Sequence, residues 1–308
     1  MAGNQTATHG DHASSFSAES TAAVLQLACL AVGLDPGGAR LVRLGENALY
    51  RLDHNHAIVR IARTMDYWND VTREVAIAAW LAEREFPGAR TATSASQPIE
   101  CIEHPVTFWE LIDGPVAAPE NVPMLGSLLR ELHDLTPPSS FRLPEVNLLN
   151  RVERRVAKAP VPSEDKDFLL NLCADLELRI GKLSFRLPAT AIHGDAHIGN
   201  VMMRGGRPIL IDFERFSWGN PEWDLAVTAT EFRTAGWWTQ RQYESFAEAY
   251  GYDVTSWDGF DTLRATHELK MTTWLMQNVE QSADIRAEYV NRMRTIRSGR
   301  PVEKWRPF

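Results

Sequence analysis

The segment from Ala191 to Phe216, AIHGDAHIGNVMMRGGRPILIDFERF, sets polar and charged side chains between short apolar runs. The apolar runs have the length and composition of strands, and the Gly205-Gly206 pair predicts a tight turn between two of them. A folded core excludes carboxylates unless something pairs with them, because an unpaired buried charge is costly. The chain must therefore fold around a short polar hairpin whose carboxylates serve a metal ion, a proton transfer or both.

Three side chains of this segment carry the chemistry. Asp195, on the predicted loop, can orient a substrate hydroxyl or accept its proton. Asn200 and Asp212 stand at the two ends of the predicted hairpin and offer hard oxygen ligands. A small set of oxygen ligands suits Mg²⁺ that keeps several waters and is shared with nucleotide phosphates. The pattern therefore predicts phosphoryl transfer.

Length and cysteine content narrow the class of protein. The chain has 308 residues, 44% of them hydrophobic, which is enough for one two-lobed domain or two small ones. Its three cysteines, Cys29, Cys101 and Cys173, are far apart and odd in number, and no CxxC pair occurs. This argues against a disulfide framework or a structural zinc site and is typical of a reducing compartment. We therefore expect a cytoplasmic protein.

Neither a membrane nor a nucleic acid is an expected partner. The longest apolar run, residues 22–34, is interrupted by Gln26, is too short to span a bilayer and follows no basic segment. We therefore expect no signal peptide and no membrane anchor. The net charge of -8 disfavours nucleic-acid binding and is compatible with a cationic substrate, although solvated acidic faces are the commoner cause.

The first third of the chain predicts a small, strand-rich lobe. Residues 1–18 are rich in Ser, Ala, His and Asn and predict a disordered tail, after which Ser20 can cap a helix. One amphipathic helix is then expected among five short antiparallel strands; the helix spans residues 70–85, and the strands span 39–44, 48–52, 56–61, 99–102 and 106–111. Residues 19–112 would form this N-lobe.

The rest of the chain, residues 113–308, predicts a larger and mainly helical lobe that carries the polar hairpin. After Pro221, which suits a first helical turn, the pattern is helical to about Ile296, with stops at Gly236 and Gly251. Earlier helices are expected around residues 125–132, 148–157 and 168–180. The predicted fold is α+β and bilobal, and a cleft between the lobes is the natural ligand site.

With its hairpin motifs placed, the sequence resembles a known family. The strings HGDAHIGN, ILIDFE and WGNPEWDLA look like those of the aminoglycoside phosphotransferase and choline kinase-like family, relatives of protein kinases. The resemblance extends over residues 40–280 and rests on the whole spaced set of motifs. It implies a protein-kinase-like fold with ATP, or in some members GTP, bound between the lobes together with Mg²⁺.

The resemblance also implies roles for single residues. Asp195 matches the catalytic aspartate, and Asn200 and Asp212 match the magnesium ligands. Asp224, in DLA, matches the buried aspartate that braces the catalytic loop, and His193 matches the histidine that holds this loop in place.

His197 leaves two interpretations open, since it matches a histidine frequent in the family's motif but can equally pack the loop. The H-x-D-x-H string also allows a metal hydrolase with His193, Asp195 and His197 as ligands. That alternative lacks the further histidine cluster that such a site needs.

The N-lobe departs from the protein-kinase pattern, because no lysine occurs before Lys158. Arg60, in AIVRIAR, is the best substitute for the lysine that clamps nucleotide phosphates, with Arg63 as a competitor. Ile58 points to the same side of the strand as Arg60 and would cover the adenine. The expected partner of Arg60 is Glu74 on the following helix, which matches the family's helix glutamate.

Two further nucleotide-binding segments follow from the resemblance. RLGENALYRL would be the phosphate loop, with Gly45 as its single glycine and Asn47 helping its backbone to turn. FWELIDG resembles the family's hinge, where backbone groups from Glu110 to Ile112 would pair with adenine.

The acceptor is expected to be a small hydroxylated molecule presented to Asp195 by the helical lobe. Acidic residues among many tryptophans there suit an amino sugar or another cationic, hydroxylated compound, or they form a solvated helix face over a Trp-rich core. These residues are Glu214, Glu222, Glu231, Asp261, Glu268, Glu280 and Asp284. The favoured function is an ATP-dependent O-phosphotransferase, and the alternative is a pseudokinase-like nucleotide-binding protein without turnover.

Overall fold

The chain forms two compact units in a computed structural model that describes residues 16–308. Met1–Ala79 and Arg90–Leu111 make up the first unit, and Trp80–Ala89 and Ile112–Phe308 make up the second. The expectation of a disordered tail over residues 1–18 falls almost entirely on positions outside the described residues. Ala18, within that range, already belongs to the first helix.

The first unit contains a five-stranded antiparallel sheet in the order β1-β2-β3-β5-β4. Each strand lies within a residue or two of its predicted place, and the turns that join β1 to β2 and β2 to β3 are marked by Gly, Asn and Asp. The strands are β1 (Arg40–Leu44), β2 (Asn47–Leu52), β3 (Ala57–Ala62), β4 (Ile99–Cys101) and β5 (His104–Glu110). Residues in β2 and β3 alternate between buried and half-buried, so the sheet has one core face.

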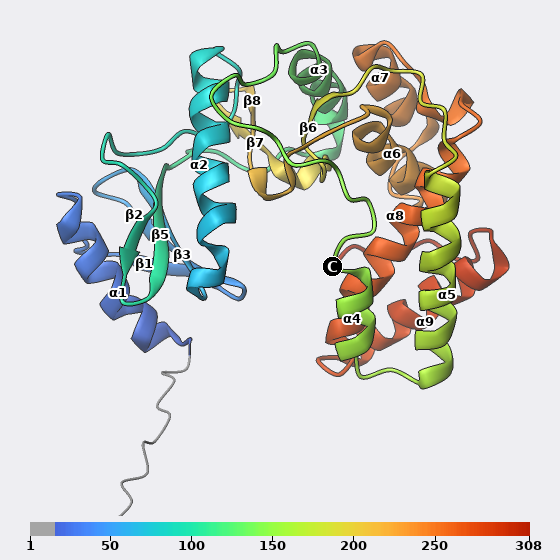
Figure 1. The fold of residues 1–308 in the computed structure, drawn as a ribbon, viewed down its shortest axis with the longest axis horizontal. Helices are drawn as coiled ribbons and strands as arrows, with labels where there is room; N and C mark the ends of the chain where they lie inside the picture. Colours follow the sequence, from blue (N-terminus) through green and yellow to red (C-terminus); the bar gives the residue numbers. More distant parts are fainter. Residues whose placement is uncertain (1–15) are drawn as a thin grey trace, which may run out of the picture. The chain divides into compact units, whose positions relative to one another are not determined.

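Two helices flank this sheet on opposite sides (Figure 1): α1 (Ala18–Ala31) and the first part of α2 (Trp68–Glu83). Leu25 and Ala28 of α1 pack in one cluster with Val59 and Ile61 of β3. The predicted cap of this helix was one turn late. Ser17 is the N-cap and Ser20 is the third helical residue of the same capping box.

The second unit is mainly helical and carries two short strand pairs. Its helices are α3 (Val122–His133), α4 (Val152–Lys158), α5 (Ser163–Ile180), α6 (Glu222–Thr230), α7 (Gln240–Tyr250), α8 (Phe260–Leu275) and α9 (Ala283–Ser298). Its strand pairs are β6 (Thr190–Ile192) with β9 (Ser217–Gly219), and β7 (Val201–Arg204) with β8 (Arg207–Leu210). The predicted turn of the second pair is confirmed, since Gly205 and Gly206 have φ of 56° and 79°. The expected α+β fold is likewise confirmed.

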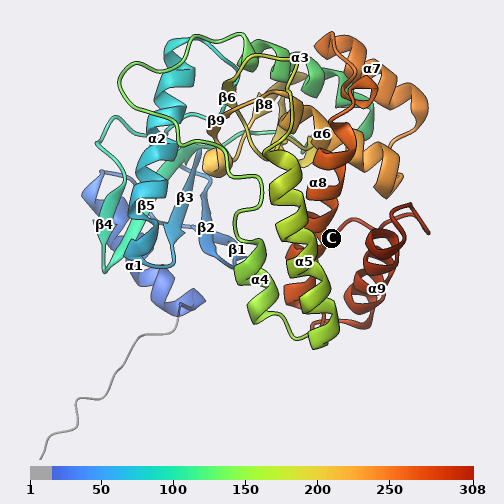
Figure 2. The same ribbon diagram turned by 45° about the vertical axis from the view of Figure 1, so that its right-hand side comes forward.

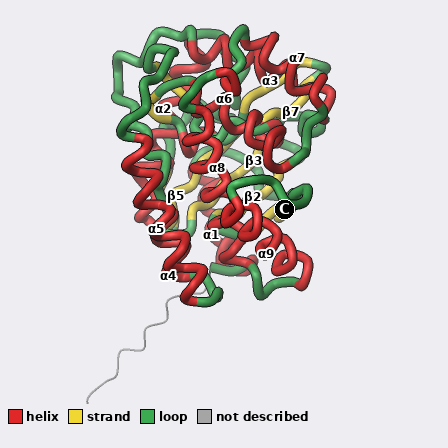
Figure 3. The backbone as a smooth tube through the Cα atoms, turned by 90° about the vertical axis from the view of Figure 1, so that its right-hand side faces the viewer, coloured by secondary structure: helices red, strands yellow, loops and turns green. Residues whose placement is uncertain are grey.

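Helix α8 is the centre of the second unit. It packs against α4, α5, α6 and α9, which Figures 2 and 3 show gathered around it. A cluster of fully buried side chains joins α4, α5 and α8, among them Val156, Leu176 and Leu269. The tightly packed α8 therefore holds the side chains on its α6 face in fixed positions.

Helix α6 continues into a π-helical turn, Glu231–Ala235, which ends at Gly236 with φ of 68°. Trp305, near the end of the chain, is 1% exposed and donates its backbone N–H to the carbonyl of Ala235 at 3.0 Å. Single π turns inside helices are frequent at functional sites. None of the helices in residues 16–308 is long and apolar enough to cross a membrane.

Candidate active site

A buried carboxylate, Asp224 at the start of α6, holds the loop that follows β6. It accepts the backbone N–H of His193 at 2.7 Å and of Gly194 at 2.8 Å. His133 Nε2 lies 3.1 Å from the same carboxylate, and Tyr250 Oη lies 3.0 Å from His133 Nδ1. Asp224 is 0% exposed, so these contacts replace its lost hydration. The loop is thereby tied to α3, α6 and α7.

Hydrogen bonds within the loop, and between the loop and the hairpin, also fix its shape. Nε2 of His193 lies 2.9 Å from the carbonyl of Ile211, and its Nδ1 accepts the backbone N–H of Asp195 at 3.3 Å. The side-chain amide of Asn200 donates to the carbonyl of Asp195 at 2.9 Å. His197 accepts the N–H of Gly199 at 3.1 Å. His193 and Asn200 therefore shape the backbone around Asp195.

Gly194 is required where the loop turns. Its φ is 82°, and a Cβ there would lie 2.3 Å from the carbonyl oxygen of Arg215. Any other residue would push the loop away from the segment that follows Asp212.

Asp195 is half-buried, and among residues 16–308 no hydrogen bond to its carboxylate is found. Burial raises the pKa of this carboxyl, but the positive charges of His197, Lys270, His193 and Arg215 together outweigh burial, so the net pKa is lowered. Asp195 is thus ionised at neutral pH. An ionised carboxylate without a fixed partner is suited to receive a hydroxyl from a ligand.

The two predicted metal ligands lie at the same end of the hairpin, because the N–H of Ile211 donates to the carbonyl of Asn200 at 2.9 Å. Asp212 is exposed and has φ of 65°. From residues 16–308, its carboxylate receives one long contact, 3.4 Å from the N–H of Glu214. Since the amide nitrogen of Asn200 is occupied, its oxygen is the atom left for a ligand. One amide oxygen and one open carboxylate fit Mg²⁺ that retains waters.

The structure disfavours the metal-hydrolase alternative. Both ring nitrogens of His193 are engaged by the loop and hairpin backbone. Within residues 16–308, no three His, Cys, Asp or Glu side chains are grouped so as to hold a metal ion. His197 accepts a backbone N–H from its own loop, which is the packing role that the sequence left open.

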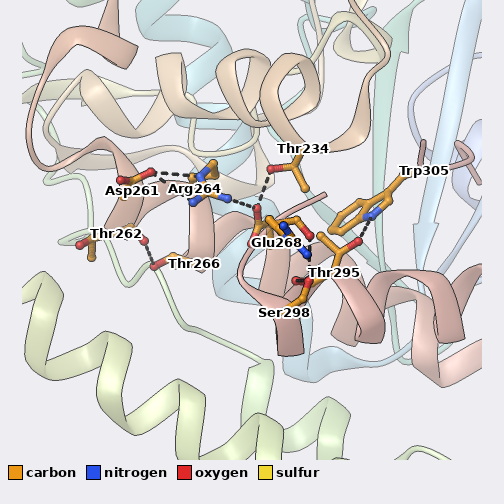
Figure 4. A network of polar contacts seen from close by, with 10 residues as sticks. Thr234, Asp261, Thr262, Arg264, Thr266, Glu268, Thr295, Ser298 and Trp305 are labelled. Atoms are coloured by element: carbon orange, nitrogen blue, oxygen red, sulfur yellow. Dashed lines mark hydrogen bonds and ion pairs between the residues drawn. The ribbon is translucent and has the colours of Figure 1, made fainter. Parts of the chain in front are cut away.

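The acidic residues expected near the acceptor mostly bind neighbouring parts of the second unit. Glu214 pairs with Arg151, and Glu222 accepts the backbone N–H of Arg186 and of Leu187. Asp261 and Glu268 both pair with Arg264, and Thr234 donates to Glu268, as Figure 4 shows. Asp284 lies 3.4 Å from Arg306. These carboxylates therefore stabilise the helical unit.

Glu231, the first residue of the π turn, differs from these acids. It is 4% exposed and accepts the indole N–H of Trp238 at 2.9 Å. Burial raises the pKa of Glu231 to about 8, opposed by the Trp238 hydrogen bond and reinforced by the charge of Asp195. Glu231 therefore carries little negative charge at neutral pH.

Three further residues next to Asp195 were missed by sequence reasoning. The indole N–H of Trp223 donates to the carbonyl of Gly194 at 3.1 Å. Lys270 Nζ lies 4.7 Å from the centre of the Trp223 ring, and the His267 ring meets it edge-on at 5.9 Å. One signal was available in the sequence, because Lys270 is one of only five lysines in the chain.

In the first unit, the expected pair of Arg60 and Glu74 is present, with Nη2 and Oε1 2.6 Å apart. Ile58 shares the half-buried face of β3 with Arg60, as its period-two spacing predicts. Arg63, the competitor, donates instead to the carbonyl of Gly45 at 2.6 Å in the turn between β1 and β2.

The predicted phosphate loop is the turn that this arginine caps, in which the N–H of Gly45 donates to the carbonyl of Asn47 at 3.0 Å. In the predicted hinge, the N–H of Glu110 donates to Arg90 and the N–H of Leu111 donates to His56.

Comparison with known proteins identifies the family of the chain. A family model described as "Phosphotransferase enzyme family" matches residues 40–265. No curated protein sequence matches the chain.

Solved structures of similar fold extend over most of the chain. An amicoumacin kinase, hAmiN, solved in complex with AMP-PNP, Ca²⁺ and Ami, has a TM-score of 0.70 at 15% identity and covers 88% of this chain and 91% of its own. Choline kinase LicA from Streptococcus pneumoniae has a TM-score of 0.63 at 16% identity, with 91% and 98% covered. Aminoglycoside phosphotransferase APH(3'')-Id from Streptomyces rimosus has a TM-score of 0.59 at 20% identity, with 80% and 98% covered.

Proposed function

This chain belongs to the phosphotransferase enzyme family, and we propose that it transfers the γ-phosphoryl group of ATP, with Mg²⁺, to a hydroxyl of a small molecule. The observation that carries the proposal is the loop around Asp195. Its backbone is fixed by Asp224, His193 and Asn200, while its carboxylate remains ionised and without a fixed partner. Phosphoryl transfer needs this combination of rigid positioning and one group that can align the nucleophile.

In the proposed reaction, Asp195 accepts a hydrogen bond from the acceptor hydroxyl and takes its proton as the new bond forms. The hydroxyl oxygen bonds to the γ-phosphorus, the bond from that phosphorus to the β,γ-bridging oxygen breaks, and ADP leaves with the electron pair. Asn200 and Asp212 would hold Mg²⁺, which supplies charge neutralisation at the phosphates.

The nucleotide part of the proposal is supported by the pair of Arg60 and Glu74. Their side chains are 14% and 4% exposed, so the guanidinium is held at one place on the half-buried face of the sheet. A planar guanidinium can hold phosphate oxygens with two parallel hydrogen bonds. The similar amicoumacin kinase was solved with AMP-PNP, which agrees with ATP as donor.

The test is phosphorylation of a panel of hydroxylated compounds with Mg-ATP, with products identified by mass spectrometry. The panel contains amino sugars, amino alcohols, neutral polyols and hydroxy acids. Asp212→Ala should abolish product formation, whereas Asp258→Ala, which removes a carboxylate that is 82% exposed, should leave it unchanged. Nucleotide binding without a phosphorylated product across the panel would favour the nucleotide-binding protein without turnover.

A further inference from the structure

Lys270, on α8, is a cation placed beside the catalytic loop with no acid bonded to it. It is half-buried, and within residues 16–308 its ammonium group has no hydrogen bond or ion pair. Its Nζ lies over the ring of Trp223, 4.7 Å from the centroid. The same indole donates to the carbonyl of Gly194, the residue before Asp195. Trp223 therefore couples the position of Lys270 to the loop.

The groups around Lys270 are mostly positive. Burial, together with the charges of Arg215, Arg155 and Arg151 and against the opposing charge of Asp195, lowers the pKa of Lys270 to about 7. Arg151 is paired with Glu214, and Arg215 donates to Asn150 at 2.9 Å. The site thus gathers guanidinium and ammonium groups in a chain whose net charge is -8.

Among residues 16–308, the carboxylate whose charge opposes these cations at Lys270 is that of Asp195. Glu231, the carboxyl whose pKa Asp195 helps to raise to about 8, is mainly protonated at neutral pH. His267, one turn before Lys270 on α8, is 7% exposed and neutral, since burial lowers its pKa to about 3. Its Nδ1 is buried, and no hydrogen-bond partner for this atom exists among residues 16–308. On this side of the loop, an oxyanion would be attracted by the ammonium of Lys270, whereas a cationic group would be repelled by it.

We propose that Lys270 binds an acidic group, a carboxylate or a phosphate-type oxyanion, of the acceptor whose hydroxyl faces Asp195. The inference rests on the proposed function and narrows the acceptor class to hydroxylated anions. Binding such a group pairs the ammonium and restores its proton. The bound acid would then be the anionic partner that residues 16–308 do not provide for Lys270.

The acceptor, rather than the nucleotide, is the expected source of the anion because of where Lys270 comes from. Lys270 and Trp223 belong to α8 and α6, which pack together. Asn200 and Asp212, the expected ligands of the metal and its phosphates, belong to the hairpin. Trp223 contacts the loop at Gly194 and Asn200 contacts it at Asp195, so a hydroxyl on Asp195 and an acid on Lys270 can belong to one molecule.

The first experiment follows the titration of Lys270 by NMR in protein made with lysine labelled with ¹³C at Cε. Only five lysine signals are expected, and Lys270→Arg identifies the one of interest. Acetate and sulfate, added separately, should raise the pKa of Lys270 saturably by about 1 or more, with and without Mg-AMP-PNP. The signal of Lys182, an exposed lysine, should not respond.

Two results of this titration would overturn the proposal. If neither anion moves the Lys270 signal, no anion site exists there. If Mg-AMP-PNP alone raises its pKa and blocks acetate and sulfate, the anion is the transferred phosphoryl group. The titration requires no turnover, so it gives its answer even if the proposed phosphotransferase activity fails.

The second experiment compares matched acceptors, each a hydroxy acid and the corresponding hydroxy amide. Wild type should prefer the acids, and Lys270→Met should lower kcat/KM for acids about 10-fold to 100-fold while leaving amides within about 2-fold. Lys182→Met is the matched control. Equal losses on acids and amides, or a wild-type preference for amides or amines, would contradict the acceptor assignment.

Discussion

Two half-buried cations, one in each unit, differ in whether they have an acidic partner. Arg60, in the first unit, forms an ion pair with Glu74, and its Nη2 lies 2.6 Å from Oε1 of that residue. Lys270 of the second unit has an indole face at 4.7 Å and no bonded acid among the described residues. An arginine paired in the fold is held in one place before any ligand arrives. A lysine without an acidic partner can form its ion pair with a ligand.

Asp224 and Asp195, both in the second unit, differ in the same way. Asp224 receives contacts from two backbone N–H groups and from His133, while Asp195 receives none at its carboxylate from residues 16–308. The bonded carboxylate therefore gives the loop its shape, and the neighbouring one stays available for chemistry. In both comparisons, the side chain expected to meet the acceptor is the one that has no fixed polar partner among residues 16–308.

The largest expected effect on stability is that of Asp224→Ala, which removes the carboxylate that is hydrogen-bonded within the fold. The change leaves two buried N–H groups and His133 without their acceptor, each costing about 1–3 kcal/mol. The free energy of unfolding should fall by about 3 kcal/mol or more in urea denaturation. A loss below about 1 kcal/mol would show that the loop does not depend on this carboxylate.

A smaller loss is expected from Glu74→Ala, which leaves Arg60 without its acid. We expect about 2 kcal/mol, below the range for fully buried pairs, because Arg60 is 14% exposed. Arg60→Ala and the double variant complete a cycle in both stability and nucleotide affinity. Non-additive losses, with about 1–2 kcal/mol of coupling, are the expected result. Additive losses would mean that the two side chains act separately.

Lys270→Met should raise the free energy of unfolding, whereas Glu74→Ala should lower it. Below the folded-state pKa of about 7, the ammonium is charged in the folded and unfolded states and its burial is unfavourable. Between pH 7 and 10.5 the folded state binds fewer protons at this site, so the stability contributed by Lys270 rises with pH.

The variant should therefore be more stable than wild type by about 1 kcal/mol at pH 6, with the difference shrinking as pH rises to 9. Thermal unfolding at several pH values measures this, with Lys182→Met as control. A variant that is less stable than wild type at pH 6 would indicate a counter-charge for Lys270 within the fold.

The smallest effect is expected from Arg63→Ala, the matched control for Arg60. Arg63 donates to Gly45 at an exposed turn, so its loss should cost about 0.5 kcal/mol in stability. ATP affinity should change by less than about 3-fold, compared with about 10-fold or more for Arg60→Ala. Equilibrium binding of Mg-AMP-PNP compares the two variants, and a larger loss with Arg63→Ala would reverse their assignments.

The sequence was most informative where interacting residues are close along the chain or follow a regular period. His193, Asp195 and Asn200 lie within one loop, so their spacing, together with the family resemblance, predicted their association. Arg60 and Glu74 come from a strand and the next helix, and the resemblance to the family predicted that they pair, while the strand period placed Ile58 on the same face as Arg60. The general plan of the sheet followed from its turns.

Prediction failed where a contact depends on how distant helices pack. Lys270 meets Trp223 only because α8 packs on α6, and no local pattern marks that meeting. The sequence left open whether the acids of the helical part bind a ligand or form a solvated face, because their partners, such as Arg264 for Glu268, were not recognisable before the fold was known. Ser17 and Ser20 cap equally well by type, so only the backbone distinguishes them.

The central claim is that Asp195 aligns the acceptor hydroxyl and takes its proton during phosphoryl transfer. Single-turnover transfer from γ-labelled ATP to an acceptor found in the panel, compared between wild type and Asp195→Asn, tests it most directly. The account predicts a rate lower by about 10² to 10⁴-fold in the variant, with Mg-AMP-PNP affinity nearly unchanged. Transfer by Asp195→Asn at the wild-type rate would contradict the account, since the one ionised carboxylate on the loop would then have no part in the chemistry.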